Sequence, residues 1–341
     1  IKKNDSFACF FGIGGPNMQK EGLNSLVNIN KLAVLGFWEV LKDLFFFLKL
    51  KKDIIKNIKK TSPSKIILID YPGLNLELVK EIKTFCSAPI IYYISPQLWA
   101  WKEKRVEIIK KYVDHMIVLF PFEKTWYKKR GVSVSFFGHP LIELHEKFLL
   151  THTPSSSCGG PVVALLPGSR QQELDQHLPL FKKIIEKLRN KNLNIHFIIK
   201  LAPGMKIDVK NQLGLARGFC INTLSSFSSF HAADFALVAS GTASLEGAIA
   251  SVPMAVIYKT SFFSWFFARL VLRTPFISIV NILNGTKVVE EFIQYNARAS
   301  IIAQHILCHL DNSQKFNYSH VVSILTKKNI YDNTAKYIVG C

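Results

Sequence analysis

Short apolar runs alternate along this chain with longer segments that mix apolar and charged residues. The runs are rich in Ile, Val, Leu and Phe and stop at turn residues, which is typical of buried strands, whereas the mixed segments indicate helices. Strands separated by helices predict mostly parallel sheets. In the first part of the chain the predicted strands are residues 7–13, 65–70, 90–94, 115–119 and 133–137, and the predicted helices are 36–60, 76–85, 102–111 and 123–129.

The alternation begins again after residues 151–161, a small, polar segment rich in Ser, Pro and Gly. Such a segment predicts an interdomain linker. The second series contains further strands and helices and ends in a helical tail. Its predicted strands are 162–166, 195–200, 219–222, 235–239 and 254–258, and its predicted helices are 178–191, 207–213, 243–250, 262–272 and 288–293.

The two series predict an α/β protein with two Rossmann-like domains, at 1–150 and 162–310, facing a central cleft. We expect the tail, 311–341, to pack back on the first domain. A doubly wound domain normally opens with a strand, a turn and a helix before a run such as 7–13. The first β-α unit is therefore expected to be missing from this sequence.

The charge of the chain adds a second expectation. There are 43 Lys and Arg against 24 Asp and Glu, a net charge of +19, and a field of that sign attracts phosphates, nucleic acid or anionic lipid headgroups. We find no nucleic-acid-binding motif, and the 26 phenylalanines lie mostly beside Leu and Ile. A membrane surface is therefore favoured over nucleic acid. No uncharged apolar run reaches about 20 residues, so no segment is predicted to span a bilayer.

Three aromatic segments beside cations are candidates for contact with lipid. They are the segment with Trp99 and Trp101, the segment with Phe262 and Trp265, and the helix at 44–60, which ends in many lysines. Apolar surface bordered by cations is typical of interfacial helices, although core packing explains many such aromatics equally well. The six cysteines form no C-x-x-C pair, which favours reduced thiols over disulfides or a zinc site.

Two polar residues of the first domain follow predicted strands. Asp70 stands before a Pro-Gly turn, where it either caps the next helix or acts as a general base in the cleft. His139 lies between a glycine, which allows close approach of a ligand, and a proline, which fixes the turn. A packing role and a catalytic role are equally open for His139.

Two loops of the second domain end strands with groups that suit a phosphate. Gly168, Ser169 and Arg170 offer backbone N–H groups and a guanidinium, the components of a diphosphate clamp. Ser240, Gly241 and Thr242 precede another helix, and Glu246 lies about one turn into it, where a carboxylate could bind ribose hydroxyls. Neither loop is a Walker A motif, and no metal-binding motif occurs, so ATP, NAD and metal chemistry are poorly supported.

Several of these segments belong to one ordered set of motifs. They are Gly-Ile-Gly-Gly-Pro-Asn-Met at 12–18, Leu-Ala-Val-Leu-Gly at 32–36, Ile-Asp-Tyr-Pro at 69–72, Ser-Pro-Gln-Leu-Trp-Ala-Trp at 95–101, Pro-Phe-Glu at 121–123, Gly-His-Pro at 138–140, Leu-Pro-Gly-Ser-Arg at 166–170, Ser-Gly-Thr-Ala-Ser-Leu-Glu at 240–246 and Asn-Ile-Leu at 281–283. In this order they resemble the lipid-A-disaccharide synthases, GT-B glycosyltransferases of lipid A synthesis in Gram-negative bacteria. The resemblance covers most of the chain, from about residue 12 to 294. It implies that 1–150 is the acceptor-side domain and that 162–310 is the UDP-sugar-binding domain.

The resemblance implies a reaction between UDP-2,3-diacylglucosamine and 2,3-diacylglucosamine 1-phosphate (lipid X). The products would be a β(1→6) disaccharide 1-phosphate and UDP, formed with inversion and without a metal or other cofactor. It also implies a cytoplasmic enzyme at the inner face of the cytoplasmic membrane, with anionic lipid as a partner and a homodimer left open. By position, Asp70 matches an essential acidic residue and Arg170 an essential arginine, while Ser240, Gly241, Thr242, Glu246 and Asn281 match the expected UDP site.

The chain departs from the family pattern at three places. The family's amino-terminal Gly-Glu-x-Ser-Gly-Asp loop is not in this sequence, Gly73 stands where an Asp is usual, and Val280 stands where a Pro is common. Three alternatives stay open, and the missing amino-terminal unit and Gly73 motivate the last of them. They are another UDP-GlcNAc-type GT-B transferase, a UDP-sugar epimerase and an inactive membrane-surface homologue.

Overall fold

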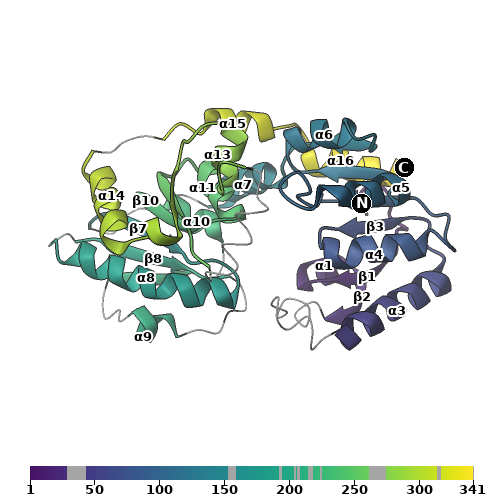
Figure 1. The fold of residues 1–341 in the computed structure, drawn as a ribbon, viewed down its shortest axis with the longest axis horizontal. Coiled ribbons are helices and arrows are strands. Elements are labelled where there is room, and N and C mark those ends of the chain that lie inside the picture. The colour runs from purple at the N-terminus through teal and green to yellow at the C-terminus, as the bar shows by residue number, and fades with distance from the viewer. Residues whose placement is uncertain are drawn as a thin grey trace. The chain divides into compact units, whose positions relative to one another are not determined.

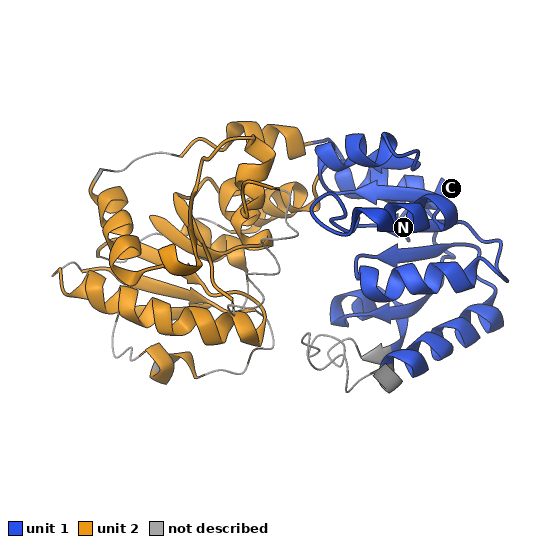
Figure 2. Ribbon diagram, in the orientation of Figure 1, with its two compact units in different colours: residues 1–138, 327–341 blue, residues 139–326 orange. Residues whose placement is uncertain are grey.

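The computed structural model describes residues 1–28, 44–152, 159–191, 194–202, 205, 208–213, 218–222, 225–260, 274–312 and 316–340. The chain forms two compact units (Figure 2). The first consists of residues 1–138 and 327–341, and the second of residues 139–326. Among the described residues, no helix is both long and apolar enough to cross a bilayer.

The first unit contains two parallel sheets (Figure 1). A two-stranded sheet pairs β1 (Phe10–Gly14) with β2 (Leu23–Asn28), and α1 (Pro16–Lys20) connects them. A four-stranded sheet has the order β3-β4-β5-β6. Its strands are β3 (Ile66–Ile69), β4 (Ile90–Tyr93), β5 (His115–Val118) and β6 (Val134–Phe136), and the unit's helices are α3 (Leu44–Thr61), α4 (Pro72–Ile82), α5 (Val106–Tyr112), α6 (Pro121–Lys128) and α16 (Ile330–Gly340), with a 3-10 turn at Glu103–Arg105.

The second unit is built on one parallel sheet with the strand order β12-β11-β10-β7-β8-β9. The chain runs outward from β7 through β8 to β9 and then returns to the other side of β7 for β10. The strands are β7 (Val162–Leu166), β8 (His196–Lys200), β9 (Phe219–Asn222), β10 (Phe235–Ala239), β11 (Met254–Tyr258) and β12 (Glu290–Ile293). The helices are α7 (Pro140–Thr151), α8 (Gln171–Arg189), α9 (Val209–Leu213), α10 (Ser226–His231), α11 (Thr242–Ile249), α13 (Ile279–Asn284), α14 (Ala299–Asn312) and α15 (Ser319–Leu325), with a 3-10 turn at Gln294–Asn296.

The apolar runs form these sheets because helices cover them. All five residues of β7 and all five of β10 are buried, as expected of strands between helical layers. In the second unit α8 lies along the sheet beside β7 and β8 (Figure 1), with Leu174, Leu178 and Phe181 in the shared core. The apolar runs therefore predicted the strands well, which confirms the α/β pattern of the sequence.

Two predicted helices need correction. The helix expected at 288–293 is wrong, because Glu290–Ile293 pairs in parallel with β11 as an edge strand. Val289 and Phe292 are buried there, so the apolar residues of this segment pack in the core beside the sheet. The helix expected to start at residue 178 starts at Gln171, and Pro179 lies inside it. The predicted helix at 262–272 and residues 36–43 of another lie outside the described residues.

The division into units differs from the expected boundaries. Helix α7 groups with the second unit, where Phe148 and His145 contact the rings of His231 and Phe227 on α10. The tail divides at residue 326. Helix α15 stays in the second unit, while α16 joins the first, where the Lys65 ammonium donates to the carbonyl of Ile338 at 2.8 Å.

Candidate active site

The sheet of the second unit marks a ligand site by its topology. The strand order reverses between β7 and β10, which lie side by side. In open parallel sheets ligands bind outside the carboxyl ends of the strands at such a switch point. The loops that leave those two ends are Gly168–Ser169–Arg170 and Ser240–Gly241–Thr242. The structure therefore brings two of the sequence-predicted segments to the same edge of one sheet.

The loop after β7 is closed by a carboxylate that the sequence analysis missed. Glu173 Oε2 accepts the backbone N–H of Ser169 at 2.8 Å and that of Arg170 at 3.3 Å. Gly168 has φ +113°, and a Cβ there would collide with the Glu173 side chain, so glycine is required. Since Glu173 takes both N–H groups, the exposed Arg170 side chain is the anion-binding group that this loop offers.

A buried histidine connects this loop to the end of β11. His177, 1% exposed, lies one turn further along α8. Its Nδ1 is 2.6 Å from the carbonyl oxygen of Pro167, and its Nε2 accepts the backbone N–H of Lys259 at 3.2 Å. Burial lowers the pKa of His177, so the ring is neutral with its proton on Nδ1. One side chain thus holds the ends of two strands.

The loop after β10 forms the amino end of α11. Gly241, with φ +154°, precedes the helix, and Thr242 is exposed. Ser244 is fully buried and donates to the carbonyl of Gly241 at 2.7 Å, so it shapes the turn. Ser240 donates to the carbonyl of Ile277 at 3.3 Å. Gly241 and Thr242 are therefore the part of this loop that meets solvent.

Glu246 lies beside a buried lysine. Burial raises the pKa of Glu246, whereas a hydrogen bond with Ser226 and the charge of Lys200 lower it. Lys200, at the end of β8, is 7% exposed and donates to the carbonyl of Leu201 at 2.6 Å. Burial lowers the pKa of Lys200, and the Glu246 charge opposes that shift. The expected ribose-binding carboxylate therefore has a nearby cation that the sequence analysis did not identify.

Asn281 has a structural role in this unit. It is fully buried, and its amide donates to the carbonyl of Val289 at 3.0 Å and to Glu291 Oε1 at 2.8 Å. Its Oδ1 accepts the N–H groups of Val288 and Val289 at 2.8 and 3.0 Å. The side chain expected in the UDP site instead fixes the connection from α13 to β12.

In the first unit the strand end at Asp70 has an unusual backbone. Asp70 has φ +43° and Tyr71 has φ +45°, both in the left-handed region that non-glycine residues avoid. The Asp70 carbonyl accepts the Tyr92 hydroxyl and the Asn75 amide, each at 2.6 Å, and these bonds hold the turn. Two consecutive strained residues are typical of functional sites. They present Asp70 as an exposed residue.

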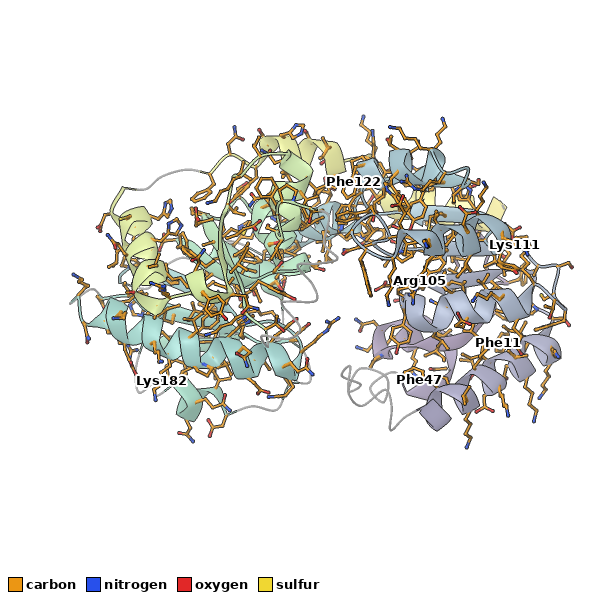
Figure 3. The ribbon with its side chains drawn as sticks, in the orientation of Figure 1. Phe11, Phe47, Arg105, Lys111, Phe122 and Lys182 are labelled. Atoms are coloured by element: carbon orange, nitrogen blue, oxygen red, sulfur yellow. The ribbon has the colours of Figure 1, made fainter. Side chains whose placement is uncertain are left out.

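An aromatic ring packs on this turn, and cationic side chains lie in the same region. The ring of Phe47, on α3 (Figure 3), stacks on Tyr71 with centroids 6.5 Å apart. Burial raises the pKa of Tyr92, on which the charges of Asp70 and Arg105 also act. Burial and the Arg105 charge lower the pKa of Lys102. The end of β3 thus combines a carboxylate with nearby cations.

The loop after β4 rests on a buried carboxylate. Glu123, 1% exposed, accepts the Trp99 indole N–H at 3.0 Å and the Phe120 N–H at 3.2 Å. Trp99 also packs edge-on against Phe122, with ring centroids 4.9 Å apart. Trp101 is 43% exposed, and the Lys102 ammonium lies 4.5 Å from its ring centroid. Trp99 therefore anchors the loop, and Trp101 is the ring available to a partner.

His139 lies at the first position of the second unit and caps α7. Its Nδ1 accepts the backbone N–H of Leu141 at 3.2 Å, and the backbone N–H of His139 donates to the carbonyl of Leu325 at 3.0 Å. The residue is 4% exposed, and burial lowers its pKa to about 4. This geometry favours the packing role over the catalytic one. Phe262 and Trp265, the other candidates for lipid contact, lie outside the described residues.

No cluster of three or more His, Cys, Asp or Glu side chains in the described part of the chain could hold a metal ion. Sequence reasoning identified the loops of the site, but it missed Glu173, His177 and Lys200, and it gave no role to Glu123 of the Pro-Phe-Glu motif. Glu173 stands three residues after Arg170, the spacing of a helix-capping carboxylate, and that signal could have found it.

Comparison with known proteins agrees with these strand-end motifs. A family model described as lipid-A-disaccharide synthetase matches residues 1–337. Lipid-A-disaccharide synthase 1 of Legionella pneumophila (strain Philadelphia 1) is 37% identical over 301 residues, which cover 86% of this chain and 78% of that protein. The lipid-A-disaccharide synthase of Coxiella burnetii (strain CbuG_Q212) is 34% identical over 345 residues, 96% of this chain and 89% of that protein.

Solved structures confirm the predicted fold class. The Staphylococcus aureus MnaA–UDP co-structure has a TM-score of 0.57 at 12% identity, covering 86% of this chain and 79% of that chain. UDP-GlcNAc 2-epimerase from Neisseria meningitidis bound to UDP-GlcNAc has a TM-score of 0.56 at 12% identity, covering 93% and 85%. Both are GT-B type α/β proteins. The family model and the sequence relatives are more specific, and they show that the chain belongs to the lipid-A-disaccharide synthase family, glycosyltransferases of lipid A biosynthesis.

Proposed function

We propose that the donor of this enzyme is UDP-2,3-diacylglucosamine and that the acceptor is 2,3-diacylglucosamine 1-phosphate. The products are the β(1→6) disaccharide 1-phosphate and UDP. The observation that supports this most strongly is the family match, because it extends over residues 1–337 and includes the strand ends with Asp70 and Arg170. A carboxylate and a guanidinium are the two charged groups that the reaction needs.

The proposed step is a single displacement at C1 of the donor sugar. The 6-hydroxyl oxygen of the acceptor forms the new bond to C1 while the bond from C1 to the diphosphate oxygen breaks. The bonding electron pair stays on the diphosphate, whose charge Arg170 stabilises, and the hydroxyl proton passes to the Asp70 carboxylate. Attack opposite the leaving group inverts the anomeric centre.

Asp70 is the better candidate for the base than His139. Asp70 is exposed at the end of β3 in a strained turn, whereas His139 is 4% exposed and caps a helix. A base must reach the proton that it removes, and an exposed carboxylate can do so. In the donor site we propose Arg170 with Ser169, Gly168, Ser240, Gly241 and Thr242 around the diphosphate, and Glu246 on the ribose.

A transfer assay with both acylated substrates tests these roles. Asp70→Asn and Arg170→Ala are each expected to lower transfer at least ~10²-fold, the range for loss of a general base or of an electrostatic stabiliser. Matched controls are Asp53→Asn on α3 and Lys182→Ala on α8 (Lys182 is labelled in Figure 3), both at exposed positions. Near-wild-type transfer by either site variant, or equal losses in the controls, would refute the assignment.

We propose that the reaction needs no metal ion, since Arg170 and neighbouring cations supply positive charge for the leaving diphosphate. Transfer is then expected to continue at its full rate after dialysis against a chelator. Loss of activity that Mg²⁺ restores would contradict metal independence. The roles of Asp70 and Arg170 would be unaffected by that result.

A second candidate is epimerisation or transfer of a non-acylated UDP-sugar. It is motivated by the similarity in fold to UDP-GlcNAc 2-epimerase, at 12% identity. Turnover of UDP-GlcNAc without acyl chains, at an efficiency comparable with the acylated donor, would favour this candidate. Turnover restricted to the acylated donor would exclude it.

We also propose that the enzyme binds the anionic inner face of the cytoplasmic membrane through α3. Exposed lysines line that helix, each expected to contribute about 1 kcal/mol near anionic lipid. Sedimentation with phosphatidylglycerol vesicles should fall when Lys52, Lys56, Lys59 and Lys60 become Gln, whereas Lys182→Gln with Lys183→Gln on α8 should have little effect. Equal binding to neutral vesicles would contradict the proposal. A homodimer stays a prediction, which light scattering can test.

A further inference from the structure

The backbone at Lys259 depends on a side chain from another element. Lys259 follows β11, and its N–H donates to His177 Nε2 at 3.2 Å. The same imidazole contacts the Pro167 carbonyl through Nδ1 at 2.6 Å. Pro167 is the first residue of the loop that ends in Arg170. A shift of this loop would therefore also shift the backbone from which the Lys259 side chain extends.

The charged groups near His177 belong to the same small region. The charges of Glu173 and Lys259 act on His177, and those of Glu173 and Arg170 act on Tyr258, the residue before Lys259. Arg170 and Lys259 thus bring two positive charges to the ends of β7 and β11, on either side of β10. Two fixed cations match the charge of a diphosphate better than one.

We propose that Lys259 is a second cation of the diphosphate site and that His177 is a positioning residue that holds it in register with Arg170. The inference rests on the proposed function, because it concerns the same donor site. The ligand class is a nucleoside diphosphate, with its two phosphates shared between the guanidinium and the ammonium. Glu173 holds the backbone that carries Arg170, and His177 holds the backbone that carries Lys259.

Binding of UDP, measured by calorimetry on the whole chain, separates these roles. Lys259→Met should raise the dissociation constant about tenfold, the effect of losing one hydrogen bond from a charged group. His177→Phe removes both hydrogen bonds of the ring, so Lys259 is no longer held in register with Arg170, and the dissociation constant should rise by a factor similar to that of Lys259→Met. In the His177→Phe background, Lys259→Met should cost much less than in the wild type, because the two residues act as a unit.

Two polar variants keep the test valid if His177→Phe folds poorly. His177→Asn keeps a donor near the Nδ1 position, and His177→Gln keeps an acceptor near the Nε2 position. The Gln variant should therefore retain more UDP affinity than the Asn variant. His305→Phe on α14 is a matched control, because His305 is a half-buried histidine of the same unit, in contact with Phe235 and Phe292. It should leave UDP affinity unchanged.

The outcomes distinguish this inference from the proposed function. If the wild type binds UDP and the Lys259 and His177 variants bind it equally well, the inference is overturned while the proposed function stands. Additive effects of Lys259→Met and His177→Phe would overturn the positioning role. If the wild type does not bind UDP, the proposed function and the inference both fail.

Discussion

The buried carboxylate beneath the Trp99 loop should make the stability of the first unit depend on pH. Burial raises the pKa of Glu123 to about 7 from an ordinary value of 4.5, against the effect of the Trp99 hydrogen bond. The folded state therefore binds the proton more tightly than the unfolded state. A difference of this size corresponds to about 3 kcal/mol of unfolding free energy.

The sign follows from which state holds the proton. Below about pH 4.5 Glu123 is protonated in both states, and its contribution is fully present. As the pH rises toward 7, the unfolded state loses the proton first, so the free energy of unfolding falls. Above pH 7 the contribution of Glu123 to the free energy of unfolding is lost completely. The buried histidines act in the opposite sense, because burial lowers the pKa of His139 and His177.

The perturbation that isolates this effect is Glu123→Gln. The variant keeps the size of the side chain and an acceptor for the Trp99 N–H, and it cannot ionise. Urea unfolding of both proteins between pH 5 and pH 8.5, followed by tryptophan fluorescence and circular dichroism, gives the difference in free energy at each pH. The histidines cancel in this difference. Trp99→Phe, which removes the N–H donor and leaves the carboxylate, is the matched control.

The difference in unfolding free energy between the variant and the wild type should change by about 3 kcal/mol between pH 5 and pH 8.5. The variant becomes more stable relative to the wild type as the pH rises. The Trp99→Phe control should retain the pH dependence, because it retains the buried carboxylate. A wild type and a Gln variant with parallel pH profiles would refute the reasoning, since Glu123 would then titrate alike in the two states.

Three further substitutions test other parts of the site. Gly168→Ala should cost about 1–3 kcal/mol of stability, since alanine disfavours φ +113° and its Cβ would meet Glu173; an unchanged melting temperature would contradict this. Asn281→Ala should destabilise the second unit by about 1–3 kcal/mol, because it leaves the N–H groups of Val288 and Val289 without their acceptor, and UDP affinity at a temperature where the variant is folded should stay at the wild-type level. Asn75→Ala should lower transfer about tenfold by releasing the Asp70 turn while leaving UDP affinity unchanged; equal transfer would show that the turn holds without it.

The strands and loops of the site could be predicted from the sequence, because each depends on local pattern. An apolar run that ends in Pro-Gly-Ser-Arg determines a buried strand and an exposed turn without reference to distant residues. The segment 288–293 shows the limit of that approach. Its Val-Val-Glu-Glu-Phe-Ile pattern suits a helix as well as a strand. The segment forms a strand because it pairs with β11 and because the Asn281 amide binds the backbone that leads into it.

The functional assignment of single residues depended on contacts that a sequence does not contain. Asn281 occupies a family motif, yet its amide is engaged by residues seven to ten positions further along the chain. Glu173 could be found from its spacing, because a capping carboxylate acts within one turn. His177 could not, since its role is to join Pro167 to Lys259, and Lys259 lies 82 positions after His177.

The path of the chain through the two units affects how the protein is made. Residues 1–138 and 327–341 form one unit, so its last helix leaves the ribosome only after the whole of the other unit. The contact from Lys65 to Ile338 spans 273 positions. Until α16 has been synthesised, the sheet face that it covers, with Ile91 and Ile117, stays exposed to solvent. Closing so long a loop is also slow. Loss of the final helix should therefore harm the beginning of the protein more than its middle.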